Sequence, residues 1–295
     1  MIKFLPEDVE TEDLLNNLRT MGREITSLLK SYSQNNLDTK EFKKKLRIKN
    51  LPSGPVTSAD IEVNEIIRKG IKDNYPSQPW EILSEENKIN PTISSDWVWI
   101  IDPLDGTKDL IQNTGEYAVH MALTYRKKVV ISIVLIPSRD EIWFYQEGKG
   151  TWCESLDGQN RSLVNTNSKS IEEITIVTSR NHFHPELAEG LKKLSPSKVL
   201  GMGSIGYKIT AILRGEADLY ITYSGPKDSS PKDWDFAAPF ALLKGNGGKI
   251  TNLECSEISF LKCKNYEQKG FIIASINNNH KDICKKLTNA FKTSF

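Results

Sequence analysis

The stretch that decides the fold is WVWIIDPLDGTKDLI, residues 97–111. Its first five residues are apolar and predict a buried strand, which ends in the acidic turn DPLDG (102–106). Pro103 fixes the backbone between two carboxylates three residues apart, so both point into one small volume at the end of the strand. Thr107 follows at the start of a possible helix, where N–H groups without a partner attract phosphate. This order predicts a site for a metal ion and a phosphate.

The oxygen donors of this turn suit a hard cation. Asp102, Asp105 and the Leu104 carbonyl offer three oxygen ligands, the type that Mg²⁺ prefers, and Gly106 allows a ligand close to the backbone. The simpler hypothesis is that the two acids only form a turn and a helix N-cap. The loop alone leaves both hypotheses open.

Three other segments place acids at the ends of predicted elements. Glu85 follows the predicted strand 80–84, and Asp235 opens a late helix. Thr57 and Asp60 stand in the first turn of a helix that we expect to run to about residue 73. Each alone is more simply a helix cap or a surface charge. The set has to be considered as a whole.

As a set, four segments resemble the lithium-sensitive, Mg²⁺-dependent phosphatase superfamily. They are PVTSAD (55–60), SEE (84–86), DPLDGT (102–107) and WD (234–235). This group includes inositol monophosphatases, fructose-1,6-bisphosphatases and 3'(2'),5'-bisphosphate nucleotidases. The similarity extends from about residue 50 to residue 275.

Within the superfamily, the details resemble the bisphosphate nucleotidases of the CysQ type. DGTKD (105–109) resembles that branch, which carries an acid after DGTK, whereas inositol monophosphatases more often have DGTTN. NTGEY (113–117), TSRNH (178–182) and GSIGYK (203–208) also resemble nucleotidase segments. Tyr207 and the long lead-in SGPKDSSPKD (224–233) depart from the pattern where the resemblance places the nucleoside.

The resemblance implies hydrolysis of a phosphate monoester by a water that two or three Mg²⁺ ions activate, with inhibition by Li⁺. It implies these ligands for the ions: Glu85, Asp102, the Leu104 carbonyl, Asp105 and Asp235. It also implies that Asp60 and Thr107 are the catalytic pair that takes the proton of the water. The implied substrate contacts, with Lys208 or His182 facing a second phosphate, are Gly106, Thr107, Ser179, His182, Ser204, Lys208 and Asp235.

The leading prediction is therefore an enzyme that removes the 3'-phosphate of 3'-phosphoadenosine 5'-phosphate to give AMP, a reaction that relieves product inhibition in sulfate metabolism. An inositol mono- or polyphosphate 1-phosphatase with the same metals is the nearest alternative. A scaffold that binds Mg²⁺ and phosphate without turnover is an alternative of a different class.

Composition excludes several classes of protein. The 39 basic and 38 acidic residues give no basic excess for a nucleic-acid polymer, and no apolar run approaches the ~20 residues that span a bilayer. The N-terminus lacks the features of a secretory signal. Four cysteines share no CxxC spacing, so we expect structural thiols and a cytoplasmic protein, either a monomer or a homodimer.

Helical and strand patterns predict a layered α-β-α-β-α arrangement, an α+β or α/β chain like the sugar phosphatases. We expect one α+β domain over 1–165, whose large antiparallel sheet carries most metal ligands, and an α/β domain over 166–295 that completes the site. The basic run 41–50 predicts a solvated strand or mobile loop. Predicted helices cover 7–33, 57–73, 185–194, 206–215, 234–248 and the chain from about 280. Predicted strands cover 80–84, 97–101, 117–125, 129–137, 141–146, 174–179, 217–223 and 271–275.

Overall fold

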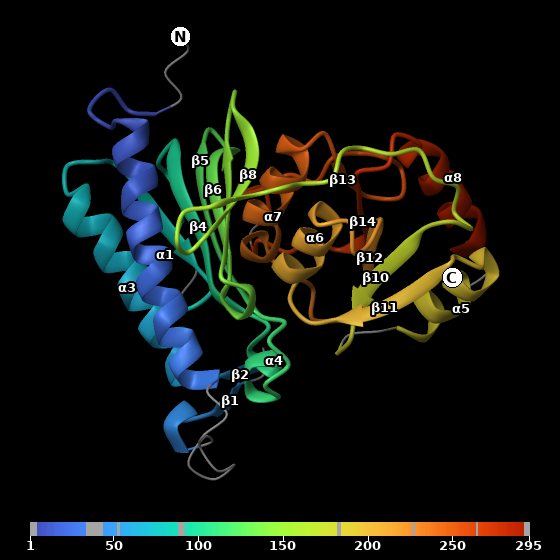
Figure 1. Ribbon diagram of the computed structural model, residues 1–295, viewed down its shortest axis with the longest axis horizontal. Coiled ribbons are helices and arrows are strands. Elements are labelled where there is room, and N and C mark those ends of the chain that lie inside the picture. The colour runs from blue at the N-terminus through green and yellow to red at the C-terminus, as the bar shows by residue number, and fades with distance from the viewer. Residues whose placement is uncertain are drawn as a thin grey trace.

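A computed structural model describes residues 5–33, 44–51, 54–87, 92–181, 184–225, 228–263 and 265–291. Helices and sheets alternate in five layers (Figure 1). The order is an outer helix pair, a seven-stranded sheet, a central helix pair, a five-stranded sheet and a second outer helix pair. The predicted layer order is thereby confirmed.

The first sheet has the strand order β3-β4-β5-β6-β7-β8-β9. All neighbours pair antiparallel except β3 and β4, which run parallel and therefore end at the same edge of the sheet. The strands are β3 (Glu81–Ser84), β4 (Trp97–Asp105), β5 (Ala118–Tyr125), β6 (Lys128–Ile136), β7 (Glu141–Gln146), β8 (Gly150–Ser155) and β9 (Asn160–Arg161).

The second sheet has the strand order β11-β10-β12-β14-β13. Its members are β10 (Thr175–Ser179), β11 (Lys198–Met202), β12 (Leu219–Ser224), β13 (Lys249–Thr251) and β14 (Gly270–Ser275). Parallel pairs join β10 to β11 and β12, while β14 runs antiparallel to both of its neighbours. Helices α5 (Pro185–Leu194) and α8 (His280–Phe291) pack together on its outer face.

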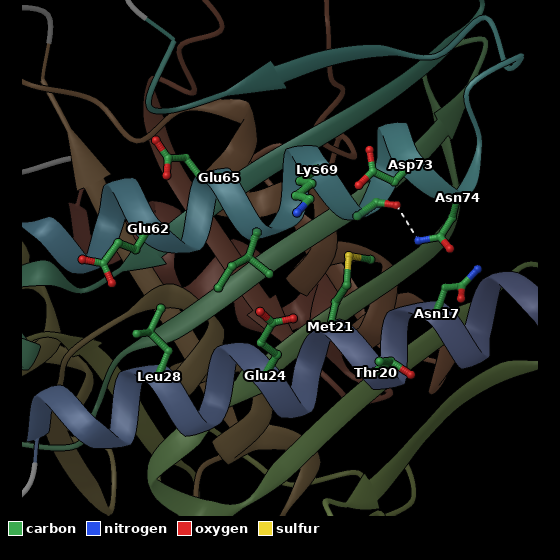
Figure 2. A pocket seen from close by; sticks show the side chains of 12 residues that line it. Asn17, Thr20, Met21, Glu24, Leu28, Glu62, Glu65, Lys69, Asp73 and Asn74 are labelled. Carbon is green, nitrogen blue, oxygen red and sulfur yellow. Dashed lines mark hydrogen bonds between the residues drawn. The ribbon is translucent and has the colours of Figure 1, made fainter.

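The outer helices of the first sheet are α1 (Thr11–Ser33) and α3 (Ser58–Asn74). Their apolar faces are buried against the sheet because apolar residues recur every three or four positions. The helices lie so close that a Cβ on Gly70 would stand 2.2 Å from Met21 Sδ. A groove of about 580 Å³ between them is lined by polar side chains including Glu24, Glu62 and Lys69 (Figure 2).

The central helices are α6 (Ile205–Leu213) and α7 (Asp233–Gly245). Both are apolar on nearly all sides, as a helix covered by two sheets must be. One apolar cluster joins them to strands of both sheets, with Val98 on one side and Ile272 on the other. These helices hold the molecule together at its centre.

The structure adds several short elements to the prediction. Residues 44–46 are helical and β1 (Lys49–Leu51) pairs with β2 (Gly54–Val56), so the basic run holds a helical turn besides the predicted strand; residues 41–43 lie outside the described ranges. Strands β8, β9, β11 and β13 and the 3-10 turn η1 (Pro137–Arg139) complete the chain, and the possible helix at Thr107 is confirmed as α4 (Thr107–Ile111). The division at residue 165 stays a prediction. Across the described ranges, no helix is long and apolar enough to cross a membrane.

Candidate active site

Four carboxylates come together at one edge of the first sheet, and we call Glu85, Asp102, Asp105 and Asp235 the acidic cluster. Strand pairing explains the first two: Ser84 lies opposite Ile101, so the next residue of each strand reaches the same edge. The Glu85 N–H donates to the Ile101 carbonyl at 3.1 Å and fixes this turn.

A change of register in β4 directs the acids of the DPLDGT turn. Asp102 pairs with His120 of β5 and Asp105 with Ala118, so β4 carries an extra residue between the two acids. Such a bulge re-aims side chains that a regular strand would place on alternate faces. The Leu104 N–H donates to Asp102 Oδ1 at 3.1 Å, which holds this carboxyl group in place.

Crowding of carboxylates changes their acidity. Burial, and then repulsion from Asp235, raises the pKa of Glu85 well above its usual range. Burial and the neighbouring Glu85 do the same to the pKa of Asp102, to which Glu85 is hydrogen-bonded. Burial and Asp105 raise the pKa of Asp235 to about 7. The protein has therefore gathered more negative charge than it neutralises with its own cations.

Asp60 and Thr107 form the second part of the site. The Thr107 hydroxyl donates to Asp60 Oδ1 at 2.8 Å and lies 3.2 Å from the Leu104 carbonyl. Thr57, the N-cap of α3, donates to Asp60 Oδ2 from its N–H at 2.7 Å and from its hydroxyl at 2.6 Å. Burial raises the pKa of Asp60 above its ordinary value. The two predicted proton-transfer residues are thus in direct contact.

Asp105 joins the first sheet to the central helices. Its Oδ2 accepts from the N–H groups of Ile205 and Gly206, at 2.5 and 3.1 Å, at the start of α6. A carboxylate is stabilised there by the helix dipole. His120 is fully buried, and its Nε2 lies 3.5 Å from the same oxygen without a hydrogen-bond partner in the described part of the chain.

The opposite nitrogen of His120 lies toward the helix that carries Asp235. Nδ1 is 3.4 Å from the Trp234 carbonyl, so one ring stands between two segments that bear acids. Burial lowers the pKa of His120, which keeps the ring neutral near neutral pH. No local pattern marks His120 as a site residue, because a single histidine in the apolar run of β5 resembles an ordinary core position.

The start of α7 is fixed by hydrogen bonds to Asp235 itself and to one further acid, Asp233. The Lys232 N–H donates to Asp235 Oδ2 at 2.6 Å. The buried Asp233 accepts from the Leu261 N–H and from Gln268 Nε2, both at 2.6 Å. These bonds hold the helix start, and with it Asp235, against a loop of the second sheet.

Three predicted substrate residues form the wall beside the cluster. Gly106 has φ +90°, and a Cβ there would stand 3.1 Å from Ser204 Cβ, so this close approach requires glycine. The Ser204 hydroxyl accepts from the Tyr207 N–H at 3.0 Å and caps α6. Lys208 is 2% exposed and donates to the Gly203 carbonyl.

The ammonium of Lys208 serves as a counter-charge. Burial lowers its pKa to about 8, and the negative charge of Asp105, followed by that of Asp109, opposes this shift most strongly. The group lies inside the wall, 5.4 Å from the centre of the Tyr220 ring, rather than on an exposed helix face. Its contact with a second phosphate stays a prediction.

A network that the sequence did not reveal ties this wall to the second sheet. Arg180 donates to Asp109 Oδ1 at 2.7 Å and to Glu116 Oε2 at 2.6 Å. The same Glu116 oxygen accepts from the Gly203 N–H at 2.8 Å. Arg180 therefore binds two protein acids that lie 71 and 64 residues away along the chain, contacts that no local pattern predicts.

The substrate contacts of Ser179 and His182 stay predictions. Ser179 ends β10 and is half-buried, and His182 lies outside the described residues. Tyr207 is turned toward other partners: its hydroxyl accepts from Arg139 at 3.1 Å, and its ring centre is 5.2 Å from the Arg214 guanidinium carbon.

The donor set fits a hard divalent cation. It consists of four carboxylates and one backbone carbonyl, all oxygen, which is the ligand type of Mg²⁺. The raised pKa values of Glu85, Asp102 and Asp235 show an excess of negative charge that bound cations would relieve. The layered fold and this acidic cluster together are those of a phosphatase.

Comparison with known proteins supports the same class. A profile described as the inositol monophosphatase family matches residues 10–291. The chain belongs to this family, and it is an enzyme. It is 30% identical to the 3'(2'),5'-bisphosphate nucleotidase CysQ of Buchnera aphidicola over 81% of this chain and 87% of that protein. It is 29% identical to the CysQ of Salmonella typhimurium, over 74% and 84%.

Solved structures show the same fold at lower identity. The suhB extragenic suppressor protein of Bartonella henselae matches with a TM-score of 0.75 and 21% identity over 96% of this chain and all of that one. A staphylococcal inositol monophosphatase-1, in an inhibitory complex soaked with LiCl, matches with a TM-score of 0.74 and 20% identity, over 96% and 97%.

Proposed function

We propose that the protein is a Mg²⁺-dependent hydrolase that removes the 3'-phosphate of 3'-phosphoadenosine 5'-phosphate and yields AMP. The acidic cluster is the observation that carries the phosphatase chemistry. The nucleotide substrate is supported by the CysQ relatives and by the acid at position 109, which binds Arg180 in the wall of the site.

The ligands divide into two overlapping groups. Glu85, Asp102 and the Leu104 carbonyl would hold one ion, and Asp102, Asp105 and Asp235 a second. When bound, Mg²⁺ supplies charge neutralisation for the phosphate and activates the attacking water. Phosphoryl transfer needs chiefly positioning and electrostatic stabilisation, so no covalent nucleophile is required.

Thr107 and Asp60 provide the route for the proton of the attacking water. The Thr107 hydroxyl can accept this proton while it passes its own to Asp60 Oδ1, 2.8 Å away. Two hydrogen bonds from Thr57 keep the carboxylate in position. Because burial raises the pKa of Asp60, its carboxylate is a better base than that of a solvated aspartate.

The wall of the site would position the phosphate. The Gly106 carbonyl, at the N-cap of α4, accepts from the N–H groups of Asp109 and Leu110, at 2.8 and 3.1 Å. The N–H groups of Thr107 and Lys108 precede these bonds and can donate to phosphate oxygens. Gly106 allows the approach, and the buried Lys208 adds positive charge behind it. The contacts of Arg180 with Asp109 and Glu116 keep the α4 and α6 segments at a fixed spacing.

A substrate panel tests the proposal. Phosphate release is measured from 3'-phosphoadenosine 5'-phosphate, inositol 1-phosphate and fructose 1,6-bisphosphate, with Mg²⁺, with Mg²⁺ plus Li⁺, and with a chelator. We expect strong preference for the nucleotide, lost with Li⁺ or chelator. Preference for inositol 1-phosphate would be consistent with the same mechanism but would favour the alternative function, an inositol mono- or polyphosphate 1-phosphatase.

Substitution of one proposed ligand distinguishes loss of metal binding from loss of the fold. Asp102→Asn should lose most activity and the binding of both ions, while circular dichroism stays that of the wild type. Asp73→Asn, an exposed acid on α3, is the matched control and should leave turnover unchanged. Near-normal turnover of Asp102→Asn contradicts the metal assignment.

A further inference from the structure

A second group of metal-ligating side chains lies in the second half of the molecule. Cys255 follows β13, and His280 and Cys284 lie on α8. One atom of each, two thiol sulfurs and a ring nitrogen, lies within 4.8 Å of the other two. None of the three belongs to the acidic cluster, and each of the four cysteines of the chain is a free thiol.

Helical spacing explains part of this geometry. His280 and Cys284 are four residues apart, so they lie one above the other on the same face of α8. Cys255 is brought to that face by a closed turn: its N–H donates to the Asn252 carbonyl at 3.2 Å, and Asn252 and Ser256 are joined by further bonds. Two elements thus present three ligands to one point.

The spacing of the three ligand atoms is close to that of a tetrahedral zinc site. Zn–S bonds of about 2.3 Å and Zn–N bonds of about 2.0 Å place ligand atoms roughly 3.5–3.8 Å apart. Atoms already within 4.8 Å of one another reach these separations through small side-chain rotations. Two sulfurs and an imidazole are a softer donor set than the oxygens of the acidic cluster, so the two sites differ in the cations they prefer.

The surroundings of His280 match those of a metal ligand. Its Nδ1 is 2.7 Å from the Ser275 hydroxyl, the kind of outer bond that orients a ligating imidazole. Its Nε2 is 2.8 Å from the Thr251 hydroxyl, which also donates to the Asn252 carbonyl at 2.8 Å. A cation at Nε2 would replace this contact, and the ring proton would move to Nδ1, where the serine oxygen can accept it.

A groove of about 460 Å³ gives access to the two sulfurs. Cys255 and Cys284 line it together with Glu254, Lys281 and Lys285. Because both sulfurs line this groove, a water from it would complete the coordination of an ion there, and the positive charges of Lys281 and Lys285 would offset the negative charges of the thiolates.

We propose that Cys255, His280 and Cys284 form a binding site for Zn²⁺, open at its fourth position to the groove. The thiols lose their protons to solvent when the ion binds. The ion links α8 to the turn after β13, and because it binds the folded chain, it stabilises the second sheet and its outer helices.

Cobalt substitution tests the site without reference to catalysis. The reduced, chelator-washed chain is titrated with Co²⁺ in excess Mg²⁺, which occupies oxygen ligands but not thiolates. We expect one equivalent of Co²⁺ to give a thiolate-to-cobalt charge-transfer band, and Zn²⁺ to remove it because Zn²⁺ binds such ligands more tightly. Thermal unfolding should shift upward with Zn²⁺.

Cysteine substitutions show which thiolates give rise to the charge-transfer band. Cys255→Ser, at a half-exposed position, should abolish it while circular dichroism and phosphatase activity stay unchanged; Cys284→Ser should abolish it as well. Cys263→Ser, an exposed thiol elsewhere, is the matched control and should keep the band. A band that survives Cys255→Ser, or no band in the reduced wild type, overturns the proposal. So does a Cys255–Cys284 disulfide in a chain that binds no Co²⁺ after reduction.

Discussion

Replacing Asp235 by Asn should stabilise the metal-free protein at alkaline pH, although it removes a proposed ligand. Burial and Asp105 raise the pKa of Asp235 from 3.8 to about 7. In the unfolded chain the group titrates at its ordinary value, so between about pH 4 and 7 the folded state holds more protons. The free energy of unfolding therefore falls as pH rises through this window and stays low above it.

The size of the effect follows from the same shift. A change from 3.8 to about 7 corresponds to a limit of about 4 kcal/mol at 1.36 kcal/mol for each pK unit. Asp235 is only half-buried, and its repulsion is shared with the other acids, so we expect about 1–2 kcal/mol. Asn carries no charge and removes this loss.

Urea unfolding at pH 5 and pH 8 measures the effect, in chelator and in Mg²⁺. In chelator, wild type should lose stability between the two pH values, and Asp235→Asn should lose about 1–2 kcal/mol less. In Mg²⁺, wild type should regain stability at pH 8 and the variant should gain less. Asp73→Asn, on the surface of α3, should follow wild type throughout. A variant less stable than wild type at pH 8 in chelator would refute the charge-crowding argument.

Three further substitutions probe the site. Thr107→Val should lower kcat by about 10²-fold with little change in KM, because it removes the hydrogen bond to the proposed base, Asp60. Thr107→Ser keeps the hydroxyl and should retain most turnover. Equal rates for the two variants would contradict the proposed proton route. Gly206→Ala should lower the free energy of unfolding by about 1–3 kcal/mol, since its Cβ would stand 2.2 Å from His120 Nε2. In a double-mutant cycle, His120→Ala should relieve most of that cost. An unchanged urea midpoint of Gly206→Ala contradicts this packing. Arg180→Met should raise KM about tenfold, or about 1.4 kcal/mol, because Asp109 loses the partner that holds the wall. It should also lower the free energy of unfolding by about 1–3 kcal/mol, because the Asp109 carboxylate is buried. An unaltered KM rules out that positioning role.

Local patterns account for what could be predicted. The apolar run 97–101 and the DPLDGT turn define β4 and its acids because strand burial and turn chemistry depend on neighbouring residues. The helical spacing of 7–33 and the cap at Thr57 similarly predict α1 and α3, which begin at Thr11 and Ser58. Strands β8 and β13 escaped prediction because they are short or carry few apolar residues, and pairing with neighbours makes them strands.

The features of the site that could not be predicted depend on contacts between residues far apart in the sequence. Asp105 and the start of α6 are about 100 residues apart, so no local pattern shows that one carboxylate accepts from two N–H groups there. The orientation of Tyr207 depends on Arg139 and Arg214, which approach α6 from other segments. The resemblance placed residues along the sequence, whereas packing decided which of them face the acidic cluster.

The burial of α7 between two sheets has a consequence for biosynthesis. Glu85, Asp102 and Asp105 leave the ribosome well before Asp235, which lies in the first turn of α7, and α7 packs against β4, β5 and β6 of the first sheet. The full set of acids can therefore come together only after α7, ending at Gly245, has been translated. A nascent chain shorter than this offers Mg²⁺ an incomplete site, so the protein acquires its hydrolytic centre as a late event of its own synthesis.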